Sequence, residues 1–288
     1  MSNLRDLKAR IKSVQSTQKL TSAMKMVATS HLKRAQLKLK AATPYLAGLR
    51  TSLSGTLHNA AAIDIPTLIK GNAQQKKGLL LFITGERGLC SNYNNLVINQ
   101  TRKIIATAEE DYLLSAIGKK GKDYFLKRGT LHRSFQINFH EPYREAQFIA
   151  TYIDLLLQQG EIGSCKIIYT QFKSALSSEV IVHDLIPFTK PLLPLESTEG
   201  ATIRPLFAVE PSLPMLLKSL AFQHLIATIF YCILSSKTSE EGARMIAMDN
   251  ASRNAEDMIR HLQLVYNRTR QAHITRELIE IIAGAEAV

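Results

Sequence analysis

Residues 215–283 read MLLKSLAFQHLIATIFYCILSSKTSEEGARMIAMDNASRNAEDMIRHLQLVYNRTRQAHITRELIEIIA, and Gly242 is the only helix-breaking residue among them. This stretch predicts a single helix of about 70 residues, which at about 1.5 Å per residue would extend roughly 105 Å. Such a length is several times the diameter of a small domain, so the helix cannot bury its apolar side inside one globule. It therefore needs a partner helix.

The other end of the chain can supply that partner. Residues 1–43 contain neither Gly nor Pro, and apolar residues recur there at alternating spacings of three and four. Twelve of the fifteen positions on this seam are apolar, which is typical of a coiled coil. The seam comprises Leu4, Leu7, Ile11, Val14, Gln18, Thr21, Lys25, Ala28, Leu32, Ala35, Leu39, Ala42, Leu46, Leu49 and Leu53. Its polar members, Gln18, Thr21 and Lys25, are consecutive, so there the seam either slips or opens toward a different partner.

Between the two helices the pattern changes to short strands that alternate with helices. The predicted strands are 79–84, 112–117, 134–139, 166–172 and 179–185, and the predicted helices are 92–110, 118–128 and 142–159. This alternation predicts βαβ units and a mostly parallel sheet with an antiparallel addition at its end.

The predicted fold is therefore α/β, with a long antiparallel coiled coil of the N- and C-terminal helices and an inserted Rossmann-like α/β domain. We place the N-terminal coiled-coil helix at residues 1–57, the globular domain at 75–190 and the C-terminal coiled-coil helix at 211–288. Pro44 should kink the first helix or mark a local break, because proline lacks a backbone donor and clashes with the preceding turn.

The net charge of +12 is concentrated in the first helix. Residues 1–50 hold eleven Lys and Arg residues and a single acid, Asp6. Nucleic acid, anionic lipid or an acidic protein surface could each be the partner of this basic helix. Because its first 40 residues contain no aromatic residue for stacking on bases, a solvated shaft that faces acidic groups is favoured over a nucleic-acid site.

Cysteine usage and hydropathy indicate the compartment. The three cysteines, Cys90, Cys165 and Cys232, are odd in number and far apart, which indicates buried thiols in a reducing compartment. The N-terminus has no apolar signal core, and the densest apolar run, Leu225–Leu234, is too short to span a bilayer. We therefore expect a bacterial cytoplasmic location and no transmembrane helix.

No catalytic constellation is evident. The loop at residues 85–92, GERGLCSN, follows a predicted strand and precedes a helix, but it lacks the ending of a P-loop and the dinucleotide fingerprint. Cys90 has no identifiable base beside it, so we expect a buried structural thiol. Glu240 and Glu241 are expected to be solvated. We predict no catalytic residue, no metal site and no cofactor, and therefore no appreciable binding or hydrolysis of ATP by the isolated chain.

Two long motifs at the ends of the chain resemble a known family. Residues 11–28 read IKSVQSTQKLTSAMKMVA and residues 262–285 read LQLVYNRTRQAHITRELIEIIAGA. Both are similar to the terminal motifs of gamma subunits of F-type ATP synthases. TGERGLC at 84–90 and IGKKGKDYF at 117–125 resemble further stretches of that family, and Glu210 with Pro211 stands where the family places an E-P pair. The family usually continues its R-G-L-C motif with Gly-Gly, where this chain has Ser91 and Asn92.

The resemblance implies a central-stalk rotor. In that reading the paired terminal helices enter a hexamer of three alpha and three beta subunits, while the globular domain contacts the epsilon subunit and the ring of c subunits. Rotation driven by transmembrane ion flow, of protons or sodium ions, would force the catalytic beta sites to change affinity. The chain would be a non-catalytic subunit, peripheral to the bacterial inner membrane on its cytoplasmic side, and would bind no nucleic acid.

The resemblance also implies contact residues. Contacts to the alpha and beta ring would come from Met24, Lys25, Arg270, Gln271, Thr275 and Glu277, and contacts of the foot with the c ring and epsilon from Phe207 and Glu210. The alternatives are a nucleic-acid-binding coiled-coil protein, which the basic helix suggests, and an enzyme that uses the α/β domain.

Overall fold

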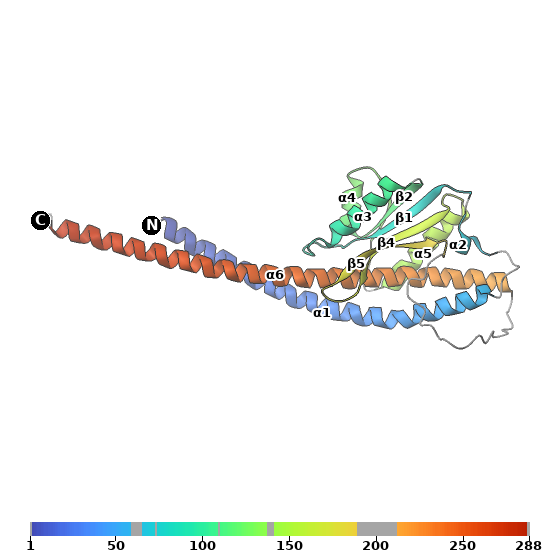
Figure 1. The fold of residues 1–288 in the computed structure, drawn as a ribbon, viewed down its shortest axis with the longest axis horizontal. Helices are drawn as coiled ribbons and strands as arrows, with labels where there is room; N and C mark the ends of the chain where they lie inside the picture. Colours follow the sequence, from blue (N-terminus) through green and yellow to red (C-terminus); the bar gives the residue numbers. More distant parts are fainter. Residues whose placement is uncertain are drawn as a thin grey trace. The chain divides into compact units, whose positions relative to one another are not determined.

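Two long helices, α1 (Ser2–His58) and α6 (Leu213–Glu286), precede and follow a five-stranded sheet along the chain in this computed structural model (Figure 1). The structure describes residues 2–58, 65–72, 74–108, 110–136, 141–188 and 212–286. The predicted domain limits at residues 190 and 211 lie outside these ranges. α1 runs through Pro44 without a break in its helical assignment, so the local break that proline suggested is absent. Burial of Ala42 and Leu46, on either side of Pro44, explains why the helix persists there.

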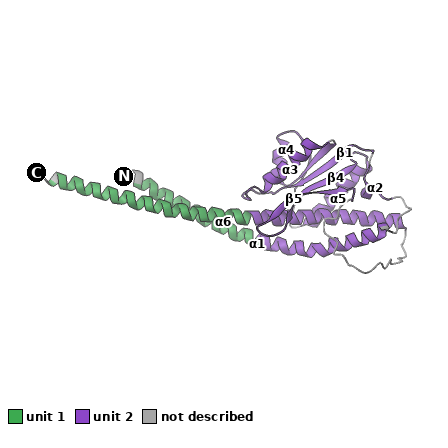
Figure 2. Ribbon diagram, in the orientation of Figure 1, with its two compact units in different colours: residues 1–30, 244–288 green, residues 31–243 purple. Residues whose placement is uncertain are grey.

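The chain forms two compact units, which Figure 2 distinguishes by colour. Unit 1 consists of residues 1–30 and 244–288, and unit 2 of residues 31–243. Each long helix thus contributes one segment to each unit. Unit 1 holds only coiled-coil segments, whereas unit 2 holds the sheet, the shorter helices and the remaining segments of α1 and α6.

Unit 1 is an antiparallel helix pair, with the start of α1 and the end of α6 on the same side (Figure 2). On the unit 1 segment of α6, the buried apolar residues recur every seven positions, at Met248, Ala255 and Leu262. On α1, the seam positions predicted from the sequence face inward, because every one from Leu4 to Ala28 is buried or half-buried. The coiled-coil prediction is confirmed for this unit.

Unit 2 is built on a sheet of strand order β3-β2-β1-β4-β5. Its strands are β1 (Lys77–Ile83), β2 (Asp111–Ile117), β3 (Leu131–Phe135), β4 (Ser164–Phe172) and β5 (Ser178–Ile186). All neighbours are parallel except β4 and β5, which form an antiparallel hairpin. The parallel sheet with an antiparallel addition is confirmed. The third strand, however, lies at 131–135 and not at the predicted 134–139, of which residues 137–139 lie outside the described ranges.

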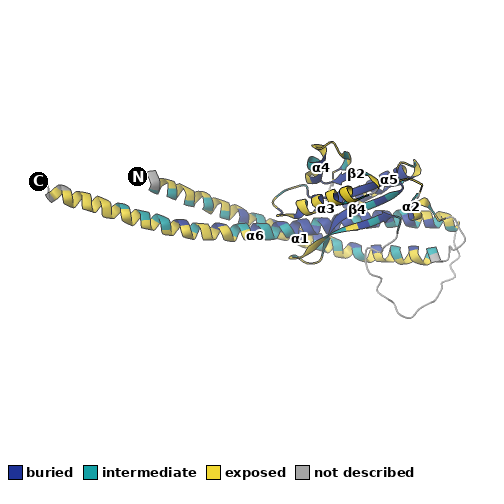
Figure 3. Cartoon of the chain, turned by 45° about the horizontal axis from the view of Figure 1, so that its top comes forward, coloured by how far each residue is buried: buried dark blue, intermediate teal, exposed yellow. Residues whose placement is uncertain are grey.

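Helices cover both faces of this sheet. α3 (Tyr93–Thr107) and α4 (Lys119–Leu126) pack on one face around Leu80, Phe82 and Val97. α5 (Pro142–Gln158), the short α2 (Thr67–Lys70) and the unit 2 segment of α6 pack on the other face, around Leu79, Leu81 and Ile153. Figure 3 shows the central strands as buried, in contrast to the exposed surface at the C-terminal end of α6. The apolar strands are therefore sandwiched, as both faces of a parallel sheet require.

The apolar part of α6 forms much of this core. Among the described residues, one helix segment, Leu213–Ala283, is long and apolar enough to cross a membrane by length and composition alone. Core helices pass the same test, and Leu225, Ile229 and Ile233 of this segment are fully buried on the sheet. Burial in unit 2 thus accounts for the apolar character of α6.

Two helical glycines of unit 2 differ in the space around them. A Cβ added at Gly242 would lie 3.3 Å from the carbonyl oxygen of Ala175, in the turn between β4 and β5, whereas nothing lies within 4 Å of a Cβ at Gly48 in α1. We therefore expect Gly242→Leu to destabilise the chain by about 1–3 kcal/mol, because the side chain must displace the turn. Gly48→Leu should stabilise it by several tenths of a kcal/mol, because leucine favours the helix and meets no obstacle.

Urea unfolding of the two variants beside the wild type measures this difference. Equal stability of Gly242→Leu and Gly48→Leu would show that the β4–β5 turn does not pack on α6 as described.

Candidate functional site

The carboxyl ends of β1 and β4 form the switch point of the sheet, because the chain leaves β1 toward β2 on one side and returns to β4 on the other. Open parallel sheets of this kind bind their ligands at such a point. The pairing of β1 with β4 ends at Phe82 and Ile168, so β4 extends past its neighbour for the residues up to Phe172. Backbone groups of β4 that face this gap need another partner, because they are buried.

Serines of α6 provide that partner. Ser235 Oγ accepts a hydrogen bond from the Phe172 amide at 2.9 Å and donates one to the Thr170 carbonyl at 3.1 Å. Ser236 Oγ accepts from the Thr170 amide at 3.2 Å. Ser239 Oγ donates to the Thr170 carbonyl at 3.4 Å. All three serines are buried, and together they continue on α6 the hydrogen bonding that β1 no longer gives to β4.

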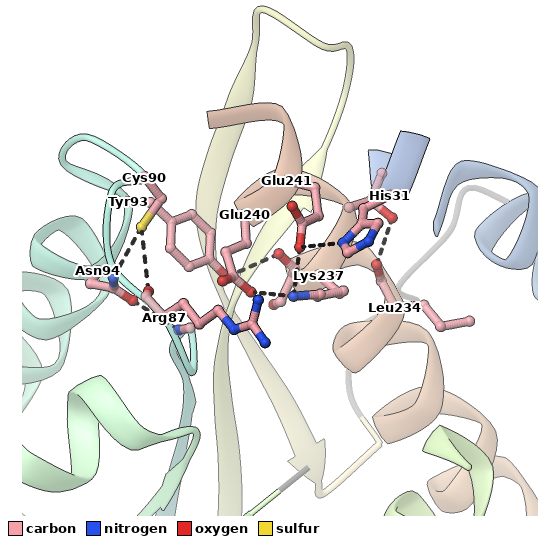
Figure 4. Close-up of polar contacts among 12 residues, drawn as sticks. His31, Arg87, Cys90, Tyr93, Asn94, Leu234, Lys237, Glu240 and Glu241 are labelled. Atoms are coloured by element: carbon pink, nitrogen blue, oxygen red, sulfur yellow. Dashed lines mark hydrogen bonds and ion pairs between the residues drawn. The ribbon is translucent and has the colours of Figure 1, made fainter. Parts of the chain in front are cut away.

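The loop after β1 meets the next turn of α6 (Figure 4). A Cβ added at Gly85 would lie 2.9 Å from both Cδ and Oε1 of Glu240, so the carboxylate touches the glycine and excludes any larger residue. Tyr93, at the start of α3, donates from its hydroxyl to the Ser236 carbonyl at 3.0 Å. Burial raises the pKa of Tyr93 well above its usual value, and the negative charge of Glu240 raises that pKa further. The hydroxyl therefore stays protonated and remains a donor.

A lysine lies between two buried carboxylates on α6. Lys237 Nζ is 3.1 Å from Glu240 Oε2 and 2.8 Å from Glu241 Oε1, and His31 Nδ1 of α1 is 3.9 Å from the same Glu241 oxygen (Figure 4). Glu240 is 2% exposed and Glu241 3% exposed, so the expectation that both are solvated is wrong. The cause is tertiary, because α6 is covered at this level by the β1–α3 loop on one side and by α1 on another.

The R-G-L-C segment shapes the same loop. Cys90 is buried, and the Asn94 side-chain amide donates to its sulfur at 3.1 Å, so the expected buried thiol is confirmed. Asn94 Oδ1 in turn accepts from the Gly85 amide at 2.8 Å. Ser91 has φ 50°, in the left-handed region that favours glycine, which gives a physical reason for the first Gly of the Gly-Gly pair that the resembling family uses there.

The serines and charged residues of this cluster escaped the sequence analysis, although a signal was present. The strongly apolar stretch of α6 ends at Leu234 and is followed at once by SSKTSEE at 235–241. From the sequence, Glu240 and Glu241 at the end of this run are expected to be solvated. Because Ser235, Ser236 and Glu241 point to different sides of the helix and are all buried, the run instead marks a covered polar junction.

Unit 1 carries a second polar feature, at the place where the seam was expected to slip or open. Gln18 and Lys25 are half-buried and Thr21 is buried, so the seam does not slip. Lys25 Nζ lies 2.5 Å from Asp249 Oδ1 of α6. The hydrogen bond from Lys25 lowers the pKa of Asp249, and Arg253, 2.8 Å from the other oxygen, lowers it further.

The large apolar side chains next to these polar seam positions lie on the surface of unit 1. Leu20, Met26 and Val27 are 61%, 67% and 56% exposed, and Met24 is half-buried. Polar residues therefore lie between the helices while apolar residues lie on the outside, the reverse of an ordinary coiled coil. Of the two alternatives from the sequence, a seam that slips is wrong, and a seam that opens toward another partner stays a prediction.

The other residues named from the resemblance lie near the end of α6 or beyond the described ranges. Arg270, Gln271, Thr275 and Glu277 are all exposed, and His273 Nδ1 is 3.2 Å from Glu277 Oε1. With Lys25 opposite Asp249 in an antiparallel pair, Ser2 lies level with about residue 272, so the rest of α6 has no segment of α1 opposite it. Phe207 and Glu210 lie outside the described residues. Within the described ranges, no group of three or more His, Cys, Asp or Glu side chains is arranged to hold a metal ion.

Comparison with known proteins gives concordant matches over the whole chain. The family model described as ATP synthase matches residues 3–288. The ATP synthase gamma chain of Rhodospirillum rubrum is 40% identical and that of Paramagnetospirillum magneticum 38% identical, with all of both chains covered in each case.

Solved structures agree in fold. A chain in the structure of the Tetrahymena thermophila mitochondrial ATP synthase central stalk and c-ring has a TM-score of 0.63 at 23% identity, covering 81% of this chain and 99% of that one. A chain of the Euglena gracilis mitochondrial ATP synthase has a TM-score of 0.68 at 17% identity, covering 99% and 94%.

The serine bonds to β4 can be tested by one substitution. Ser235→Ala keeps the helix but leaves the partly buried Phe172 amide without the hydrogen-bond partner that Ser235 supplies, so we expect a loss of about 1 kcal/mol in the free energy of unfolding. Ser52→Ala, at an exposed position of α1, should change it by less than about 0.5 kcal/mol. Denaturant unfolding of both variants provides the comparison, and a Ser235→Ala chain as stable as the control would contradict this role.

Proposed function

This chain belongs to the family of ATP synthase gamma chains, and we propose from that premise that it is the rotor shaft that couples transmembrane ion flow to ATP synthesis and hydrolysis by catalytic beta subunits. ATP chemistry in this proposal occurs on the partner subunits, and the chain contributes contacts that change with its rotational angle. The full-length match to gamma chains is the observation that carries the proposal.

The organisation of the chain supports a shaft joined to a foot. α6 is a single helix of 74 residues, and its first part is the core of the α/β unit, where Leu225 and Ile229 are fully buried. Its last part belongs to the coiled-coil unit and ends as an exposed helix. A turning force applied to the α/β unit would thus pass into the coil through a helix that is continuous and firmly packed at its origin.

The surface of unit 1 supports contacts with a surrounding ring. Leu20, Met26 and Val27 present an apolar surface near Lys25, while Arg270, Gln271, Thr275 and Glu277 present directional polar groups. We propose that these two surfaces meet a hexamer of alpha and beta subunits. An apolar surface allows sliding because its attraction is non-directional, whereas the polar groups can distinguish rotor angles.

The remaining partners follow from the family. We propose that the α/β unit binds the epsilon subunit and the c-subunit ring, with Phe207 and Glu210 at the foot. The complex would hold the chain at the cytoplasmic side of a bacterial inner membrane as a peripheral subunit. Co-expression with the alpha and beta subunits of the same organism tests the assignment: a stable complex with ATPase activity supports it, and a gamma chain that never co-purifies with them contradicts it.

The position of Lys25 gives a test of the coupling contact. Its side chain is 43% exposed, so the ammonium can face a partner while it contacts Asp249. We expect Lys25→Glu to lower ATP-driven proton pumping per ATP hydrolysed, because the charge that would face an acidic surface of the ring is reversed. The pumping is measured in membrane vesicles that contain the assembled complex.

Asp249→Asn is the matched control, because it removes the carboxylate of the pair and leaves the charge of Lys25 in place. We expect this variant to retain most of the pumping. An equal loss in both variants would show that only the pair within the chain matters and that Lys25 has no contact with the ring.

A further inference from the structure

The position where a doubly wound domain ordinarily binds an anionic ligand is filled here by the chain itself. Such domains bind at the carboxyl ends of their strands, at the switch point, beside a glycine that permits close approach. In this chain the switch point lies between β1 and β4, and Gly85 follows β1 immediately after Thr84. The group in contact with Gly85 is the carboxylate of Glu240, which comes from α6, some 150 residues further along the chain.

The environment of this carboxylate is that of a bound ligand. Its side chain is 2% exposed. Cδ and Oε1 lie against Gly85, and Oε2 lies 3.1 Å from Lys237 Nζ. A buried carboxylate is costly unless a charged or polar group pairs with it, and the ammonium of Lys237, which also lies 2.8 Å from Glu241 Oε1, is such a partner for Glu240.

We propose that the loop after β1 and the facing turn of α6 form a carboxylate-binding site whose resident ligand is Glu240. The site holds the β1–α3 loop to the unit 2 segment of α6. When the Glu240 side chain is shortened to alanine, the site accepts a small free carboxylate such as acetate, which supplies the atoms that the substitution removes. This inference concerns the chain alone and stands or falls independently of the rotor proposal.

Chemical rescue of the full chain tests the site. Glu240→Ala should lower the melting temperature, and sodium acetate at about ten times its dissociation constant should raise it again by about 2–4 °C, because a ligand that binds only the folded state stabilises that state. Acetamide has nearly the same shape and no charge, so it should have no such effect. Sodium chloride at equal ionic strength controls for general salt effects.

A matched glutamate variant separates specific rescue from a general effect of acetate. Glu179 pairs with Lys173, and both side chains are more than half exposed. Glu179→Ala and the wild type should gain no more from acetate than from sodium chloride. An acetate effect of the same size in Glu240→Ala, Glu179→Ala and the wild type, or equal rescue by acetamide, would overturn the proposal.

A second measurement tests the proposal even if Glu240→Ala folds poorly. Refolding yield in acetate against acetamide gives the same comparison without a melting curve. In addition, Gly85→Ala should destabilise the wild type, because its Cβ would displace the carboxylate, and should cost at most half as many degrees when Glu240 is already alanine. Additive effects of Gly85→Ala and Glu240→Ala would show that Glu240 does not occupy a site at Gly85, and would overturn the proposal.

Discussion

Burial of a polar stretch of α6 against the end of a parallel sheet is the constraint on which the rest of the structure depends. The apolar part of α6 alone would pack on the sheet at many registers, because nondirectional contacts tolerate sliding. Ser235 and Ser236 remove that freedom, because each hydroxyl must meet a particular amide of β4. Glu240 adds a charged contact to the loop after β1. These contacts prevent α6 from sliding along its axis or rotating about it. They therefore fix the position of α6 relative to the sheet within unit 2.

Unit 1 differs, because a polar pair lies between its two helices and large apolar side chains lie on its surface. Lys25 and Asp249 take seam positions that apolar residues would ordinarily fill, which costs the pair some of its own stability and gives it a defined register. The apolar side chains of Leu20, Met26 and Val27 are left for another surface. A helix pair selected for stability alone would have apolar residues in the seam and polar residues on the surface. The arrangement found here is consistent with a member of the ATP synthase gamma chain family, whose coil we propose to turn inside a ring.

The sequence predicts the fold well because its strongest signals are periodic. The heptad seam of α1, the alternation of strands and helices, and the near absence of breakers in α6 each depend on spacing, which needs no tertiary information. The predictions for Glu240 and Glu241 failed because burial there is produced by elements distant in sequence, the β1–α3 loop and α1. Pro44 does not interrupt the helix for a similar reason, since packing around Ala42 and Leu46 outweighs the lost hydrogen bond, while the predicted kink stays a prediction. The ring-contact residues came from resemblance to a family and remain proposals, because partner surfaces leave no period in the chain.

The central claim is that the α/β domain and the adjoining segments of the coil move as one body. It is tested most directly by a disulfide between the β4–β5 turn and α6, at Ala175→Cys with Gly242→Cys. A Cβ at Gly242 lies 3.9 Å from Cα of Ala175, which brings the two sulfurs within bonding reach after a small shift, and the native cysteines are buried. ATP-driven proton pumping is then measured in the assembled complex, oxidised and reduced. The account predicts the same pumping in both states; loss on oxidation that reduction restores would show that the domain must move on α6 during turnover, and would contradict it.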